Sequence, residues 1–171
     1  MGWNPTLPMM AMARLAPSMR LILWTAGIVF LLDRLTKWAV IDIIDLPRLG
    51  RMEVVDPFLN FVMAWNEGIN FGLTFAPPEV MRWGLIVLAI GISAGLFWWA
   101  GRRAPQKGQR AVAFGAGIVI GGALGNAWDR LQYGAVADFL NMSCCGIANP
   151  YAFNIADVAI FAGAVLIAWK A

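Results

Sequence analysis

The most informative stretch of the chain is the apolar run at residues 111–139, which reads AVAFGAGIVIGGALGNAWDRLQYGAVADF. The segment Ala111–Leu131 is long enough to cross about 30 Å of hydrocarbon at roughly 1.5 Å of rise per residue. Gly117, Gly121 and Gly125 recur every four residues, and small residues at that spacing let helices approach closely inside a membrane bundle. We expect this glycine stripe to pack against other helices of the same chain, and the protein to be a monomer.

The composition of the whole chain agrees with a membrane location. Its 171 residues are 60% hydrophobic and only 13% charged, with a mean hydropathy of +0.68. That composition is too apolar for an ordinary soluble domain. The net charge of +3 comes from basic residues that are spread along the chain, so we attribute it to the positive-inside rule and expect no nucleic-acid partner.

The hydropathy pattern predicts an all-α polytopic membrane protein with four transmembrane helices. The loop at residues 101–110 contains basic residues and no acidic one, which places it in the cytoplasm. An even number of spans then places both termini in the cytoplasm as well. The expected spans are approximately Met19–Val40, Val80–Ala100, Ala111–Leu131 and Phe153–Trp169.

The rest of the chain suggests one domain with an extension. Residues 1–18 show no regular period and predict a flexible cytoplasmic extension, whereas residues 19–171 form the membrane domain. Within that domain, the connection at about 41–79 is too long for a plain loop. Its residues 51–62, RMEVVDPFLNFV, are rich in β-branched and aromatic side chains around a proline, which favours strands. We expect a small extracytoplasmic β-sheet, or β-cradle, on the outer surface of the membrane.

The sequence contains no histidine, which excludes Ser-His-Asp and Cys-His catalysis and histidine-ligated zinc. Cys144 and Cys145 are adjacent, so they cannot supply a four-ligand zinc site by themselves, and we interpret them as small loop residues. Any hydrolysis must therefore use carboxylates or the few lysines. We expect neither a metal nor a cofactor.

Asp138 and Asp157 lie at the edges of apolar segments, where an ionised side chain costs about 2.5 to 3.5 kcal/mol on insertion scales. Asp157 and Asn154 share one face at the start of the fourth span. If the chain folds back after the third span, Asp138 faces Asp157 across a small gap. Two such carboxylates cannot both ionise easily, so one could activate water while the other donates a proton. For each aspartate alone, a loop residue or a first-turn acid favoured by the helix dipole remains an alternative.

Two further sets of polar residues have helical i, i+3, i+4 spacing. Asp33 and Lys37 predict either a structural ion pair at the interface or an acid that lines a site, with a lysine that orients it or meets lipid headgroups. In the second set, Arg130 is expected to hold Asp129 as a structural clamp. Asn126 and Arg130 are expected to reach towards a substrate backbone or the carboxylates.

Five motifs follow one another along the chain. They are Asp33-x-x-Thr36-Lys37, Asn66-x-Gly68-x-x-Phe71-Gly72, Gly125-Asn126-x-x-Asp129-Arg130, Gly134-x-Val136-x-Asp138-Phe139 and Phe153-Asn154-x-Ala156-Asp157. With them the chain, from about residue 20 to residue 170, resembles the lipoprotein signal peptidases, the type II signal peptidases of bacteria. The resemblance implies an aspartyl endopeptidase of the bacterial cytoplasmic membrane, active at its outer face. It would remove the signal peptide from diacylglyceryl-modified prolipoproteins, cutting just before the lipidated cysteine.

The resemblance also assigns roles to residues. It implies that Asp138 and Asp157 form the catalytic dyad, which globomycin-type cyclic peptides would block. The residues implied to bind substrate or inhibitor, or to support the site, are Asp33, Lys37, Asn66, Gly68, Asn126, Asp129, Arg130 and Asn154. Asn70 and Trp128 depart from the usual pattern and change its local shape. One alternative is a small proton-coupled transporter, although such folds tend to have repeats and broken helices at the midplane. Another is a non-catalytic membrane assembly factor, which would explain the glycine-rich packing but not Asp138 and Asp157 together with the asparagines.

Overall fold

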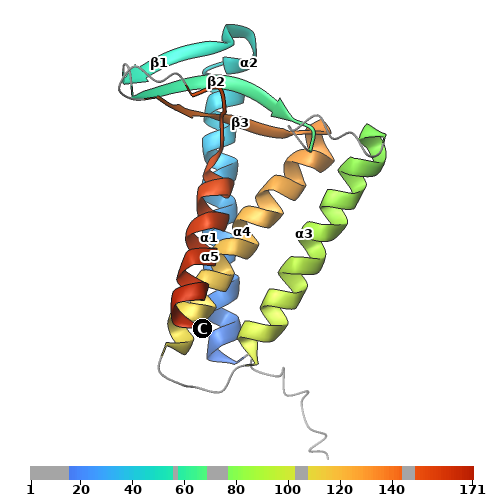
Figure 1. Ribbon diagram of the computed structural model, residues 1–171, viewed down its shortest axis with the longest axis vertical. Helices are drawn as coiled ribbons and strands as arrows, with labels where there is room; N and C mark the ends of the chain where they lie inside the picture. Colours follow the sequence, from blue (N-terminus) through green and yellow to red (C-terminus); the bar gives the residue numbers. More distant parts are fainter. Residues whose placement is uncertain (1–15, 56–57, 69–76, 103–107, 144–148) are drawn as a thin grey trace, which may run out of the picture.

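Four long helices and a small sheet make up the described part of the computed structural model. The helices run side by side, and the sheet lies across one end of them (Figure 1). We call this end of the bundle the sheet end. The long helices are α1 (Pro17–Trp38), α3 (Pro78–Gly101), α4 (Gln109–Tyr133) and α5 (Ile155–Lys170). The structure describes residues 16–55, 58–68, 77–102, 108–143 and 149–171.

The helix bounds agree with the expected spans to within about two residues. α1 begins at Pro17, inside the segment 1–18 that the sequence assigned to the extension, because proline suits the first turn of a helix. Beyond Trp38 the chain continues as the π-helical segment η1 (Ala39–Ile43) and the short helix α2 (Leu46–Leu49). Residues 1–15 of the predicted extension lie outside the described residues.

The sheet contains three antiparallel strands in the order β1-β2-β3. β1 (Arg51–Val55) and β2 (Leu59–Asn66) come from the connection for which strands were expected. β3 (Val136–Met142) comes from the next connection on the same side, where no strand was expected. Its residues are buried at nearly every position, so the strand shows no polar alternation in its sequence. The chain enters it through Gly134, whose φ of +82° ends α4 and favours glycine.

The glycine stripe of α4 packs against helices of the same chain, as predicted. A Cβ atom at Gly121 would lie 2.6 Å from the carbonyl oxygen of Ala26 on α1. Gly122 lies outside the predicted stripe and faces α5, where a Cβ atom would lie 2.5 Å from the carbonyl oxygen of Ala156. The missing side chains therefore let α4 contact α1 on one side and α5 on the other.

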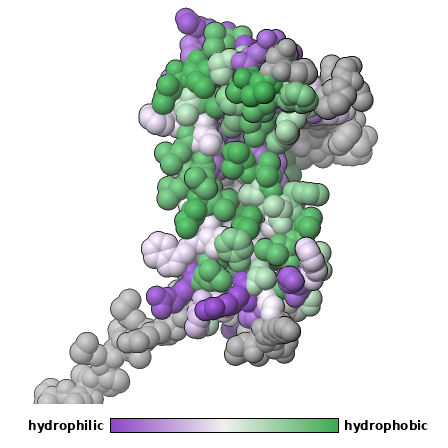
Figure 2. Space-filling model, turned by 90° about the vertical axis from the view of Figure 1, so that its left-hand side faces the viewer, coloured by the Kyte–Doolittle hydropathy of each residue, from purple (hydrophilic) through white to green (hydrophobic). Residues whose placement is uncertain are grey.

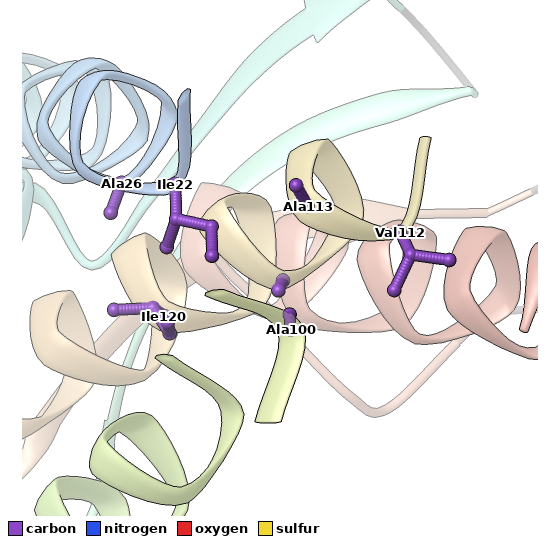
Figure 3. Packing of buried hydrophobic residues seen from close by; sticks show 7 residues of the cluster. Ile22, Ala26, Ala100, Val112, Ala113 and Ile120 are labelled. Carbon is purple, nitrogen blue, oxygen red and sulfur yellow. The ribbon is translucent and has the colours of Figure 1, made fainter. Parts of the chain in front are cut away.

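A cluster of small and branched apolar residues closes the end of the bundle opposite the sheet. Figure 3 shows α1, α3 and α4 meeting there. Alanines at the contacts let the three helices come close together. The buried members are Ile22, Ala26, Ala100, Val112, Ala113, Ala116 and Ile120.

Large apolar side chains also cover the outside of the helices. Val87 is 67% exposed and Phe161 is 75% exposed, and Figure 2 shows a hydrophobic band between hydrophilic ends. Among the described residues, α3 and α4 are long and apolar enough to cross a membrane. α1 carries several charged residues near the sheet end, and α5 has only 16 residues. The count of four spans therefore stays a prediction.

Candidate active site

Asp138 lies in β3 and is only 3% exposed. Two amide groups donate to its carboxylate. Asn66 Nδ2, from the end of β2, lies 3.1 Å from Oδ2, and Asn154 Nδ2, from the N-cap of α5, lies 2.6 Å from Oδ1. The antiparallel pairing of β2 with β3 brings the first amide to the acid, and the docking of α5 below the sheet brings the second. The carboxylate is therefore buried, and both of its oxygens accept hydrogen bonds.

Asp157 lies in the first turn of α5 and forms a capping box with Asn154. Asn154 Oδ1 accepts from the Asp157 backbone N–H at 2.9 Å, and Asp157 Oδ2 accepts from the Asn154 backbone N–H at 3.2 Å. The other carboxylate oxygen, Oδ1, accepts from Asn126 Nδ2 at 2.8 Å. Asn154 thus donates to both acids, through its side chain to Asp138 and through its backbone to Asp157. Asp138 comes near Asp157 because the chain turns at Gly134, after α4, and enters β3.

The surroundings of Asp138 change its affinity for a proton. Its pKa is raised from 3.8 to about 6, mainly because burial penalises the charged form and secondly because Asp157 is nearby. The hydrogen bonds from Asn66 and Asn154 and the positive charge of Lys37 lower the pKa but do not cancel the increase. Two neighbouring acids with one raised pKa can hold one proton between them, which is the arrangement required for paired acid and base catalysis.

Asp129 forms ion pairs, but not with Arg130, the partner that the sequence predicted. Arg34 Nη2 lies 2.5 Å from its Oδ1 and Lys37 Nζ lies 2.5 Å from its Oδ2, both from α1. Arg130 follows Asp129 directly, and adjacent residues of a helix do not face each other. Arg130 Nη1 instead donates to the carbonyl oxygen of Asn126 at 3.2 Å. Its buried Nε has no hydrogen-bond partner in the described part of the chain.

Asp33 and Lys37 form the structural ion pair that was one of the two expectations. The distance from Lys37 Nζ to Asp33 Oδ2 is 3.0 Å, and both residues are buried. A lysine that is 2% exposed does not meet lipid headgroups, so that part of the alternative is wrong. Lys37 Nζ also lies 3.4 Å from Asn126 Oδ1. This contact turns the amide nitrogen of Asn126 towards Asp157.

Gly68 places the end of β2 against α3. Asn66 Oδ1 accepts from the Gly68 backbone N–H at 3.1 Å, which leaves the Asn66 amide nitrogen to donate to Asp138. A Cβ atom at Gly68 would lie 2.8 Å from Met81 Cγ on α3. The rest of this motif, with Asn70, and the cysteine pair at 144–145 lie outside the described residues.

The sequence interpretation missed two arginines. Arg34 contacts both Asp33 and Asp129, and the signal that could have revealed it is a second basic residue near the end of an apolar helix. Arg82 on α3 donates to the carbonyl oxygens of Arg130 and Leu131 at 2.7 Å and 3.0 Å and so caps the C-terminus of α4. No sequence pattern connects Arg82 to α4. Where the structure describes the chain, it contains no group of three or more His, Cys, Asp or Glu residues that could hold a metal ion.

Solved structures share this combination of helices and sheet. Two, each described as a bacterial membrane enzyme, are 25% and 26% identical to this chain, with TM-scores of 0.71 and 0.69. The alignments cover 86% and 85% of this chain and 90% and 84% of theirs. The fold is thus that of a class of bacterial membrane enzymes.

Sequence relatives identify the family. The protein-family model described as signal peptidase (SPase) II matches residues 25–171 of the chain. Lipoprotein signal peptidases of Methylobacterium sp. (strain 4-46) and Rhodopseudomonas palustris are 39% and 43% identical, over 81% of this chain in both cases and 81% and 84% of theirs. The chain belongs to the signal peptidase II family, as its motifs predicted. It is a hydrolase that removes signal peptides from prolipoproteins, which favours the enzyme over the transporter alternative.

Proposed function

We propose that Asp138 and Asp157 are the catalytic dyad, and that the enzyme cuts a diacylglyceryl-modified prolipoprotein immediately before the lipidated cysteine. The observation that carries the proposal is the pair of acids that both accept hydrogen bonds from Asn154. Two carboxylates held by one residue, one of them with a pKa raised to about 6, are suited to share a proton.

The reaction begins with a dyad that holds one proton. The ionised carboxylate takes a proton from water, and the water oxygen attacks the carbonyl carbon of the scissile peptide bond. The protonated acid donates its proton to the carbonyl oxygen, which gives a neutral tetrahedral diol. The C–N bond then breaks as the protonated carboxyl group gives its proton to the departing amine, the new N-terminus of the cysteine, while the ionised carboxylate takes a proton from a diol hydroxyl and the product carboxyl group forms. The dyad acts as a unit, so the shared proton belongs to the pair.

The polar neighbours of the dyad would orient it and the substrate. Asn66, Asn126 and Asn154 donate to carboxylate oxygens, which restricts the rotation of both acids. Arg130 is half-buried and carries an Nε without a hydrogen-bond partner among the described residues, so it is suited to donate to the substrate backbone. Globomycin-type cyclic peptides would occupy the same groups.

We also propose that the four long helices span the bacterial cytoplasmic membrane, with both termini in the cytoplasm and the dyad at the outer face. The end of the bundle opposite the sheet supports this orientation, because Arg20, Arg102, Arg110 and Lys170 lie near it. A lipid-modified substrate would reach a monomeric enzyme through the bilayer. Burial of its acyl chains would supply much of the binding free energy.

The test uses purified variants and a lipid-modified prolipoprotein in detergent. Asp138→Asn and Asp157→Asn should stop cleavage while the proteins remain folded, as judged by size-exclusion chromatography and thermal unfolding. Asp42→Asn, which removes an exposed carboxylate near the same end of the bundle, should cleave like the wild type. Near-normal turnover by either dyad variant would refute the dyad. A mature product whose measured mass does not begin at the lipidated cysteine would refute the proposed cut site.

A further inference from the structure

Four charged residues form a buried cluster between α1 and α4 at the sheet end. Arg34 Nη2 lies 2.8 Å from Asp33 Oδ2 and 2.5 Å from Asp129 Oδ1. Lys37 Nζ lies 3.0 Å from Asp33 Oδ2 and 2.5 Å from Asp129 Oδ2. Two positive and two negative groups thus neutralise one another. Burying such a cluster costs desolvation free energy that its attractions often only offset, so stability alone does not explain it.

The second hydrogen bond of each aspartate leads to the proposed dyad. Asp33 Oδ1 accepts from the backbone N–H of Ala156, the residue before Asp157, at 3.2 Å. Asp129 Oδ2 accepts from the backbone N–H of Ala137, the residue before Asp138, at 3.2 Å. One carboxylate therefore holds the start of α5 and the other holds β3. The spacing between these two carboxylates contributes directly to the spacing between the two dyad acids.

Arg34 joins the two supporting carboxylates through a single atom. Its Nη2 donates to Asp33 and to Asp129 and lies 3.5 Å from the carbonyl oxygen of Gly125. The absence of a side chain at Gly125 lets Asp33 approach α4, because a Cβ atom there would lie 2.7 Å from Asp33 Oδ2. The Phe30 ring covers the guanidinium at 5.9 Å from its centroid, and Arg34 is only 17% exposed.

We propose that Arg34 is a positioning residue for the peptidase reaction, which sets the separation of Asp138 and Asp157 by holding Asp33 and Asp129 together. The inference rests on the proposed dyad. Among the described residues, the hydrogen bonds of Arg34 go to Asp33, Asp129 and Gly125 and to neither dyad acid, so Arg34 acts through the two carboxylates and the backbone that they hold.

Lys37 does not make Arg34 redundant. Without Arg34, one ammonium group would face two buried carboxylates, and the cluster would carry a net negative charge. Repulsion would then separate the ends of α1 and α4, and with them the backbone before each dyad acid. A displacement of about 1 Å at reacting groups can reduce the rate about 10²-fold.

The experiment compares Arg34→Met and Arg34→Lys with Arg20→Met. Arg20 is an exposed arginine at the other end of α1, so its substitution removes the same charge from the same helix. Purified enzymes are assayed with the lipid-modified prolipoprotein in detergent over about pH 5 to 9 to obtain kcat and KM. Thermal unfolding of each variant is measured in the same buffers.

Arg34→Met should lower kcat about 10²-fold, while KM stays within about threefold, because the dyad geometry changes and substrate contacts do not. The limb of the pH profile in which activity falls with rising pH should also move from its wild-type position, because the separation of the two acids and the net charge of the neighbouring cluster both change how tightly the dyad holds its proton. Arg34→Lys retains the charge on a shorter side chain without the planar fork of a guanidinium, so it should lower kcat less than Arg34→Met does, by about three- to tenfold relative to the wild type. Arg20→Met should match the wild type.

A wild-type kcat and pH profile in Arg34→Met would overturn the inference, even if its unfolding temperature fell, because only a structural role would remain. If Arg34→Met does not give folded protein, Arg34→Lys decides, and a kcat and pH profile equal to the wild type would then overturn the inference. Asp138→Asn, assayed in parallel, separates the two proposals. An inactive Asp138→Asn beside a fully active Arg34→Met would reject the role of Arg34 alone, whereas an active Asp138→Asn would reject the dyad.

Discussion

Replacing Asp138 with asparagine removes a buried titrating group while keeping the size of its side chain. In the folded protein its pKa is raised from 3.8 to about 6. That difference corresponds to about 3 kcal/mol at 1.36 kcal/mol per pKa unit. Because the folded state binds this proton more tightly than the unfolded state, the stabilisation is complete below about pH 4 and is lost as the pH rises through about 6. The free energy of unfolding of Asp138→Asn, relative to the wild type, should therefore rise by about 3 kcal/mol between about pH 4 and pH 7.

A second effect of the same substitution does not depend on this titration. The asparagine oxygen can still accept the hydrogen bond from Asn154, but its NH₂ group would meet the Asn66 amide nitrogen, which is also a donor. Losing the bond to Asn66 should cost about 1 kcal/mol at every pH. The test is therefore the slope of the stability difference against pH, and the absolute stability of the variant does not enter it.

Thermal unfolding in detergent at a series of pH values measures this slope. In a chain of this size, 1 kcal/mol corresponds to about 2 to 4 °C, so the difference in Tm should change by roughly 6 to 12 °C across the window, in favour of the variant at higher pH. Asp42→Asn controls for the loss of one negative charge at an exposed position. A difference that stays constant with pH would refute the argument from burial. A change in the opposite direction would mean that the folded protein stabilises the carboxylate.

Three other substitutions or treatments test separate parts of the site. Gly125→Ala should lose activity and about 1 to 3 kcal/mol of stability, because the new methyl group would meet the Asp33 carboxylate. Gly27→Ala is the control, because nothing lies within 4 Å of a Cβ atom there, and it should change neither activity nor stability. Equal effects of the two substitutions in folding and cleavage assays would contradict the close packing at Gly125. Asn66→Ala removes a hydrogen bond that lowers the pKa of Asp138. The pH at which kcat/KM falls on the alkaline side should therefore increase. An unchanged pH profile would mean that this hydrogen bond does not act on the titrating pair. Incubation with a chelator should leave cleavage unchanged, and a loss of activity reversed by added metal would reject the carboxylate mechanism.

Properties of single segments could be predicted from the sequence. Helix bounds follow from the length and hydropathy of each apolar run, and these were accurate to about two residues. The glycine stripe predicted close packing inside the chain, because a missing side chain has the same consequence whichever helix comes near it. The spacing of Asn154 and Asp157 predicted that they lie together at the start of the last helix, where Asn154 is the N-cap and Asp157 follows in the first turn.

Contacts between segments required the tertiary structure. β3 was not predicted, because both of its faces are buried and its sequence lacks the alternation of a half-exposed strand. The sequence predicts Arg130 as the partner of Asp129, because the two residues are adjacent in the chain. The structure supplies Arg34 and Lys37 from another helix instead.

The amino-acid sequence alone indicates an apolar helical membrane protein, carries the motifs of the signal peptidase II family and marks Asp138 and Asp157 as catalytic candidates. The packing of the helices against the sheet is needed to show that both acids meet at Asn154 and that Arg34 links the carboxylates of Asp33 and Asp129. This difference arises because helical periodicity shows only which residues share a face of one helix. Which residue of another segment lies opposite that face depends on how the helices and the sheet pack together.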